Sequence, residues 1–207
     1  MRLWKSFRVQ RRNEISYYDT MGEFEAERFA VNLNQLIAEA MAEKQKAGVI
    51  FLCIGTDRST GDSLGPLVGH KLRKCRLKKA AVIGTLDKPV HAMNLEVYAA
   101  YIRTHFPDHV IVAIDASVGS PDHVGFATLG KGALQPGLGV SKELMEVGDI
   151  SITGIVGGPG SGDVTKCASF HGNENGRLHL RKHYPCRTIL GKYSHNMTKF
   201  LHSFCYS

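Results

Sequence analysis

The chain has 207 residues, 43% of them hydrophobic, which is enough for one domain with a sizeable core and argues against two. It lacks an apolar run of about 18 residues, so we expect no membrane-spanning helix. Five cysteines, an odd number without Cys-x-x-Cys spacing, favour a reducing compartment and a cytoplasmic protein. The net charge of +7 is concentrated in residues 157–207, which hold seven Lys and Arg against two Asp and Glu. The remainder is nearly neutral, so nucleic-acid binding by the domain is not expected.

The first 47 residues divide into an extension and a helix. Residues 1–21 carry the basic side chains of a signal peptide but lack its apolar core, so we expect a loosely packed extension that stays on the protein. Residues 22–47 predict a helix, because apolar side chains recur at helical spacing: Phe29, Leu33, Leu36, Ile37, Ala40 and Met41.

The next stretch is the most informative part of the chain. Residues 49–54 are apolar and few enough for a strand buried on both faces. A polar, glycine-containing loop follows at 55–61, and Asp62 or Ser63 can cap the next helix, with Pro66 in its first turn. Asp62 would then lie at the carboxyl edge of a parallel sheet, where α/β proteins place their chemistry. A phosphate-binding P-loop is not predicted, because no lysine follows the last glycine of the loop.

Strands and helices alternate over the rest of the domain. The predicted elements are a strand at 80–84, a loop at 85–93, a helix capped by Asn94, a strand at 109–114, a weaker strand at 125–129 and a final edge strand at 147–156. This alternation favours right-handed crossovers and a mainly parallel sheet. We therefore expect a three-layer α/β/α domain over residues 22–156.

The strand at 109–114 supplies a second carboxylate, Asp115. If this strand and the one at 49–54 are parallel neighbours, Asp62 and Asp115 emerge at the same edge of the sheet. Two carboxylates that share a site push one pKa upward, so that one can act as general base while the other holds a proton. Aspartates at strand ends also form turns or cap helices, and these structural roles are the alternative.

Loop residues around this pair are candidates for binding substrate. Three glycines, Gly55, Gly61 and Gly65, would allow a substrate backbone to approach closely. Two polar loop side chains, Asp57 and His91, are within reach of the same edge. The Arg58 guanidinium would lower the pKa of a nearby carboxylate and help to keep it ionised.

Nucleophilic catalysis fits the sequence less well. Ser63 lacks the Gly-x-Ser-x-Gly elbow. Cys53 lies within the buried strand and should be inert.

Four segments of the chain resemble the YyaC family of sporulation proteins: 51–69 (FLCIGTDRSTGDSLGPLVG), 84–94 (GTLDKPVHAMN), 110–120 (VIVAIDASVGS) and 132–156 (GALQPGLGVSKELMEVGDISITGIV). That family is similar to the germination protease of endospore-forming bacteria and, more remotely, to the hydrogenase-maturation endopeptidases. The resemblance implies a phosphorylase/hydrolase-like α/β/α fold and a spore protease. By the same resemblance, Asp62 and Asp115 match the catalytic carboxylate pair of the germination protease.

The resemblance does not extend to a metal site. The maturation endopeptidases bind nickel through two carboxylates and a later histidine, but the matching region here, 136–142, contains no histidine. Two oxygen ligands alone would hold a divalent cation loosely. We therefore expect neither a metal nor another cofactor.

Residues 157–207 depart from the family, in which a glycine turn, a strand and an amphipathic helix follow. This basic tail holds five of the ten histidines and three of the five cysteines, without a sustained helical period. A zinc site is one interpretation, from Cys167, His171, His179, His183 and Cys186, but the spacing matches no known zinc motif. We favour an altered reading frame that replaced the family's C-terminal elements.

Together with the resemblance to the germination protease, these features predict an aspartate-dependent endopeptidase. Its substrate would be a protein or peptide, cleaved during sporulation or germination in the cytoplasm of the sporulating cell or in the spore core. A non-catalytic sporulation factor that keeps the protease fold to bind a partner is the alternative, and a metal-dependent maturation-type hydrolase is a third. A homo-oligomer is left open.

Overall fold

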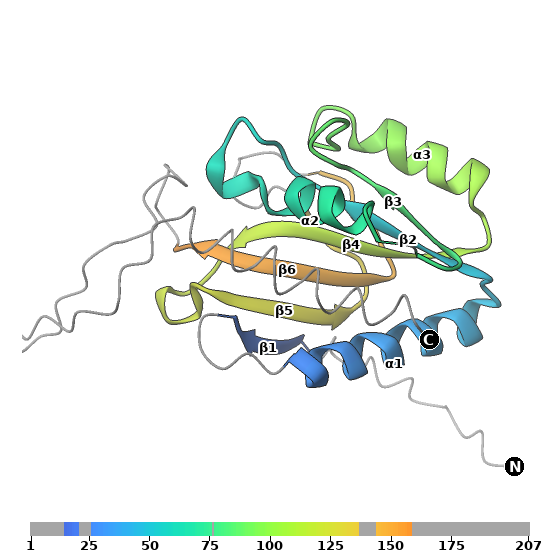
Figure 1. Cartoon of the computed structure of the whole chain (residues 1–207), viewed down its shortest axis with the longest axis horizontal. Coiled ribbons are helices and arrows are strands. Elements are labelled where there is room, and N and C mark those ends of the chain that lie inside the picture. The colour runs from blue at the N-terminus through green and yellow to red at the C-terminus, as the bar shows by residue number, and fades with distance from the viewer. Residues whose placement is uncertain (1–14, 21–25, 76, 137–143, 159–207) are drawn as a thin grey trace, which may run out of the picture.

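The computed structural model describes residues 15–20, 26–75, 77–136 and 144–158, which form a mixed α/β domain (Figure 1). Its elements are β1 (Ile15–Asp19), α1 (Ala26–Lys44), β2 (Gly48–Cys53), the 3₁₀ turn η1 (Thr60–Asp62), α2 (Leu64–Leu72), β3 (Ala80–Ile83), α3 (Leu95–His105), β4 (His109–Val118), the 3₁₀ turn η2 (Pro121–His123), β5 (Phe126–Lys131) and β6 (Ile150–Gly157). Among these described residues, no helix has the length and apolar character needed to cross a membrane.

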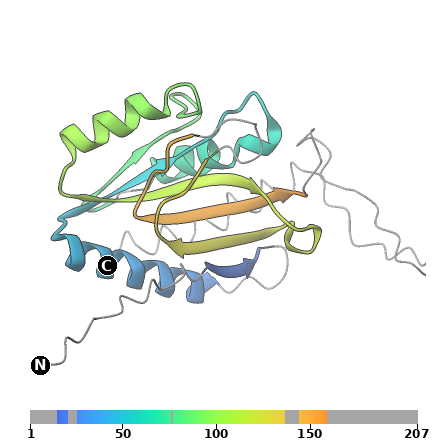
Figure 2. The same cartoon turned by 180° about the vertical axis from the view of Figure 1, so that it is seen from behind.

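The six strands form one sheet in the order β1-β5-β6-β4-β2-β3, visible from both sides in Figures 1 and 2. Strands β3, β2, β4 and β6 pair in parallel, whereas β5 runs antiparallel to both β6 and β1. The expected parallel arrangement therefore holds for four strands, and the sheet as a whole is mixed.

Strand β6 is not the edge strand that the sequence predicted, because it lies between β4 and β5. Its polar residues suggested a solvent-facing side, but they bond to the neighbouring strand instead. The Thr153 and Thr128 hydroxyls are 2.6 Å apart, and the Ser151 hydroxyl donates to the Gly130 carbonyl at 3.3 Å. Cross-strand bonds between hydroxyls stabilise a sheet interior as well as an edge.

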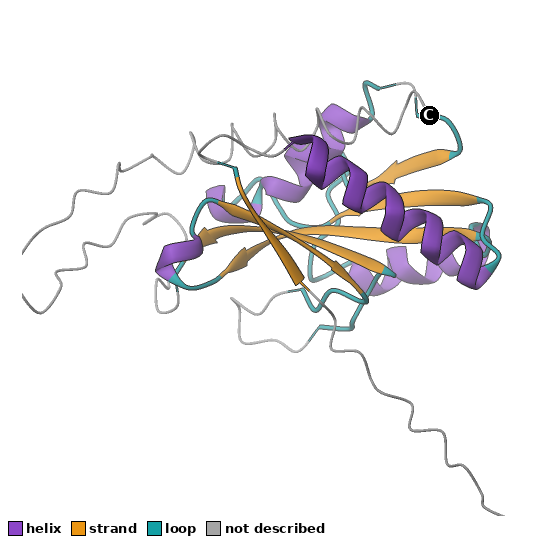
Figure 3. Cartoon of the chain, turned by 90° about the horizontal axis from the view of Figure 1, so that it is seen from below, coloured by secondary structure: helices purple, strands orange, loops and turns teal. Residues whose placement is uncertain are grey.

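Apolar clusters cover both faces of the sheet. Helices α1 and α2 pack with Val49, Phe51 and Cys53 on one face, and α3 packs with Ile50 and Leu52 on the other. Figure 3 shows α1 lying across its face of the sheet. Every residue of β2 is buried, as expected for a strand covered on both sides. Each such large side chain contributes about 1.5–3 kcal/mol by leaving water.

The domain begins earlier than residue 22. Strand β1 falls within the expected N-terminal extension, yet it pairs with β5 along its whole length. Tyr18 is 1% exposed, meets the Phe29 ring edge-on at 5.0 Å, and accepts a hydrogen bond from the Asn32 amide at 2.7 Å. An isolated five-residue strand gives little sequence signal when its partner is 110 residues away. Residues 1–14 and 159–207, with the proposed zinc ligands and frame change, lie outside the described residues.

We predict that Tyr18→Ala destabilises the domain by about 3–5 kcal/mol, the usual cost of removing a buried aromatic ring. The neighbouring Tyr17, which is 45% exposed, is the matched control, and Tyr17→Ala should cost well under half as much. Urea unfolding of both variants measures the difference. Equal effects would mean that β1 is a peripheral attachment.

Candidate active site

A tight turn after β2 places Asp62 above the sheet edge. Gly55 has a φ of 134°, and its N–H donates to the Val90 carbonyl at 2.7 Å. The loop then folds back, so that the Thr56 N–H donates to the Asp62 carbonyl at 3.0 Å. A Cβ atom at Gly55 would lie 2.0 Å from that carbonyl oxygen. Only glycine combines this backbone conformation with this approach.

The start of α2 is equally close to the strand. A Cβ at Gly65 would lie 2.0 Å from the Ile54 carbonyl oxygen, so the first turn of the helix contacts the strand backbone directly. Pro66 occupies that first turn, as predicted. Ser63 is the N-cap residue but makes no side-chain cap bond, and Asp62 lies in η1 before it. Helix capping therefore does not explain the Asp62 carboxylate.

Asp115 lies inside a strand and not at its end, which corrects the expected boundary. The pairing of β2 with β4 stops at Cys53 and Ile114, but β4 continues along β6 to Val118. Asp115 is the first β4 residue beyond the point where β2 turns away. It is 5% exposed, and its Oδ1 accepts a hydrogen bond from the Ala116 N–H at 2.8 Å. Strand β4 runs on past the end of β2 because it continues to pair with the interior strand β6, which was expected at an edge.

The two carboxyl groups interact electrostatically. Burial raises the pKa of Asp115 well above its usual range, and the negative charge of Asp62 raises it further. The hydrogen bond from the Ala116 N–H lowers this pKa, but by less. Burial also raises the pKa of Asp62, but a hydrogen bond from the Thr56 backbone and the charge of His91 oppose the rise. The pair is therefore asymmetric: Asp62 is the carboxyl that ionises first, and Asp115 is the one that keeps a proton.

The remaining predicted residues divide into near and far groups. His91 acts on Asp62 through its charge, and Gly55 shapes the loop beneath it. Asp57 and Arg58 are exposed at the loop tip. The groups that oppose the rise in the Asp62 pKa are the Thr56 backbone and His91, and Arg58 is not among them.

Two threonines beside the pair were not predicted as site residues. Thr153 lies opposite Asp115 in the register of β4 and β6, and Thr128 lies opposite Thr153. A polar row thus runs from the carboxylate across two further strands. The alternation of polar and apolar residues in 147–156 contained this signal, but without the strand order it could not be assigned to the site.

Residues 21–180 match the family model described as "Protein of unknown function (DUF1256)". The chain belongs to this family. It is also 42% identical over 127 residues to "Uncharacterized protein YyaC" of Bacillus subtilis (strain 168), a match that covers 61% of this chain and 62% of that protein. The chain thus spans less than two thirds of its curated relative. The resemblance to the YyaC family is confirmed, and the DUF1256 match continues 24 residues beyond residue 156.

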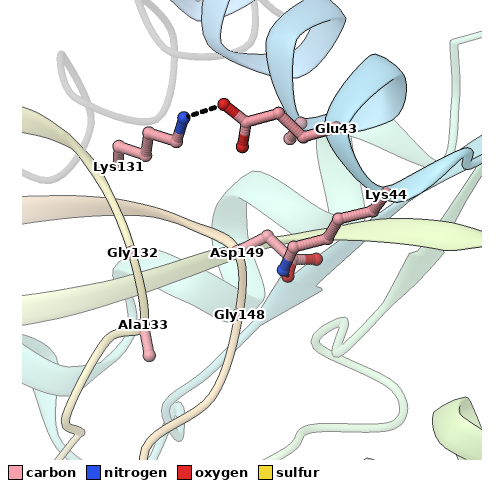
Figure 4. Close-up of a pocket in the computed structure, with 8 residues that line it drawn as sticks. Glu43, Lys44, Lys131, Gly132, Ala133, Gly148 and Asp149 are labelled. Carbon is pink, nitrogen blue, oxygen red and sulfur yellow. Dashed lines mark hydrogen bonds and ion pairs between the residues drawn. The ribbon is translucent and has the colours of Figure 1, made fainter. Parts of the chain in front are cut away.

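A depression on this DUF1256 domain lies away from the carboxylates, near the C-terminal end of α1 and the start of β6 (Figure 4). It has a volume of about 420 Å³ and is lined by charged residues that pair with one another. Lys131 donates to Glu43 at 2.6 Å, Lys44 pairs with Asp149, and Asp149 also accepts from the Ile111 N–H at 2.8 Å. These bonds tie α1 to the sheet, so we assign the cluster a structural role.

Within the described ranges, no three His, Cys, Asp or Glu side chains are grouped closely enough to hold a metal ion. The chemistry that the described residues can perform themselves is proton transfer between two carboxyl groups of different pKa.

We predict that Gly55→Ala destabilises the domain by at least about 1–3 kcal/mol, because alanine is strained at this φ and its methyl group would displace the Asp62 carbonyl. Gly158→Ala is the control, since its Cβ would lie 3.7 Å from the nearest atom. Thermal and urea unfolding measure both effects. A Gly55 variant as stable as the Gly158 variant would contradict the close approach.

We predict that Asp115→Asn stabilises the protein at neutral pH. A raised native pKa means that the unfolded chain releases its proton first, so the wild type loses stability as the pH rises above the ordinary carboxyl range. Asparagine can still accept the Ala116 hydrogen bond, and it removes the free-energy cost of ionising a buried carboxyl group.

The test is urea unfolding from about pH 4 to pH 8. The stability difference between Asp115→Asn and wild type should be near zero at the acidic end and grow with pH. Asp57→Asn removes an exposed carboxylate and should show no such growth. A difference that stays constant with pH would contradict the burial of an ionisable Asp115.

Proposed function

We propose that this chain is an aspartate-dependent endopeptidase that cleaves a protein or peptide substrate during sporulation or germination. The observation that carries the proposal is the asymmetric pair formed by half-buried Asp62 and buried Asp115 at the carboxyl side of the parallel strands. The sequence resemblance to the germination protease supports it further. We place the reaction in the cytoplasm of the sporulating cell or in the spore core.

The pair suits hydrolysis by an activated water molecule. Ionised Asp62 removes a proton from water, whose oxygen then bonds to the carbonyl carbon of the substrate. Protonated Asp115 donates to the carbonyl oxygen and offsets the charge that develops there. When the C–N bond breaks, the proton held by Asp62 passes to the leaving amine, and Asp115 keeps or regains its own. One water molecule is consumed and both carboxyl groups return to their starting state.

Contacts with a substrate would come from the loop tip and not from the glycines. The Asp62 carbonyl occupies the space beside Gly55, and Gly61 is buried. Asp57 and Arg58, exposed at the loop tip, are available to contact substrate side chains of opposite charge. These contacts would determine sequence preference and not the chemical step.

A non-catalytic binding factor is the second candidate, and one observation favours it. Asp115 is only 5% exposed in the absence of substrate, so a substrate reaches it only if the adjacent loops move. A family member that had lost activity could keep the same pair and use the loop tip to bind a partner.

The deciding experiment is a cleavage assay on spore protein extract, with new termini identified by mass spectrometry. We predict that Asp62→Asn and Asp115→Asn each reduce cleavage by at least about 100-fold, the scale of general acid–base catalysis. Asp108→Asn, which changes an exposed carboxylate just before β4 and at the other end of that strand from Asp115, is the matched control and should retain the cleavage rate.

The pH profile provides an independent readout. Activity requires ionised Asp62 and protonated Asp115, so it should be bell-shaped, and both limbs should lie above the ordinary aspartate range because both pKa values are raised. A folded wild type that cleaves nothing at any pH would favour the binding factor.

A further inference from the structure

The side chain of Asn94 does not perform the task that its position suggests. Asn94 is the N-cap residue of α3, where asparagine usually accepts a hydrogen bond from the first turn of the helix. Here it makes no such bond. Its Oδ1 accepts from the His91 N–H at 2.8 Å, and its Nδ2 donates to the Pro89 carbonyl at 3.1 Å. The amide therefore holds the loop that precedes the helix and leaves the helix uncapped by this side chain.

The same loop fixes the tautomer of His91. The Met93 N–H donates to His91 Nδ1 at 3.3 Å. A ring nitrogen that accepts a hydrogen bond carries no proton, so the neutral imidazole holds its proton on Nε2. Nε2 lies on the opposite edge of the ring from the bond to Met93. The loop thus offers a hydrogen-bond donor on the edge of His91 that points away from its own backbone.

This loop is attached to the site. Val90 forms a parallel bridge with Ile54 and accepts a hydrogen bond from the Gly55 N–H at 2.7 Å. His91 is therefore one residue from the turn that carries Asp62.

We propose that Asn94 is a positioning residue, which holds His91 as the Nε2–H tautomer so that this group donates a hydrogen bond to the substrate carbonyl beside Asp62. The inference rests on the proposed peptidase function for the identity of the acceptor, and the clamp itself rests on the three hydrogen bonds of the loop. The structural alternative is that Asn94 only stabilises the start of α3. The two ideas differ in what a replacement cap residue would restore.

Asn94→Ser and Asn94→Asp separate these roles. Serine is a good N-cap residue, but its single hydroxyl is too short to bridge His91 and Pro89. Aspartate caps equally well and keeps an acceptor for the His91 N–H, although it loses the bond to Pro89. We expect both variants to fold with a melting temperature close to that of the wild type. Only the serine variant should release His91.

The first readout is the tautomer of His91, measured by two-bond ¹H–¹⁵N correlation spectra of the ring. The wild type and Asn94→Asp should show an unprotonated Nδ1, whereas Asn94→Ser should show a mixture of tautomers. His123, whose Nδ1 lies 3.2 Å from the Ser120 hydroxyl, is the internal control and should not change. An unchanged His91 tautomer in Asn94→Ser would overturn the proposal.

The second readout is the cleavage assay. Asn94→Ser should lower kcat by up to roughly 100-fold, as for a misplacement of about 1 Å, with KM less affected, and Asn94→Asp should recover most of the loss. Full kcat in Asn94→Ser would overturn the role of His91 toward substrate. A shifted tautomer in a protein that cleaves nothing would support the clamp and count against the peptidase function, so the two failures are distinguishable.

Discussion

The site depends on one steric constraint, the close approach of the Asp62 carbonyl oxygen to the Cα atom of Gly55. The carbonyl occupies the space where any other residue would place its Cβ, 2.0 Å away. This contact folds the loop back over the strand end and starts α2 directly above Ile54. As a result, the backbone position of Asp62 is fixed by this contact, and the neighbouring loop tip at Asp57 and Arg58 is exposed. A carboxylate on a constrained turn beside exposed loop residues suits a binding or catalytic site.

Burying a second carboxyl group beside the first opposes stability. The sheet provides little compensation for an ionised Asp115, since Ala116 donates a single hydrogen bond to it. Thr153 lies opposite in the register, but its hydroxyl bonds to Thr128 and not to the carboxylate. A second donor would have lowered the pKa of Asp115 and favoured its charged form. The arrangement keeps Asp115 protonated, at a cost in stability that a purely structural residue would not need.

The elements that the sequence predicted well are those whose signal is local. The run at 49–54 contains only apolar residues, and α3 has a clear period and start, so both appear close to their expected bounds. Strand β1 and the interior place of β6 were missed because they depend on pairing with distant strands. The last residues of β4 were missed for the same reason, because they pair with β6 and not with β2. Sequence alternation shows which faces differ, but it does not show which strand lies next to which.

The candidate site shows the same division. Asp62 and Asp115 could be found from sequence, because each follows an apolar run that must end at the same sheet edge if the strands are parallel. The sequence could not show which cation acts on Asp62, because Arg58 and His91 are both loop residues. The bridge between Ile54 and Val90 brings the His91 loop to the site. Asn94 was predicted as a cap from its position alone. Its side chain bonds to His91 and Pro89 in the preceding loop instead of to the first turn of the helix.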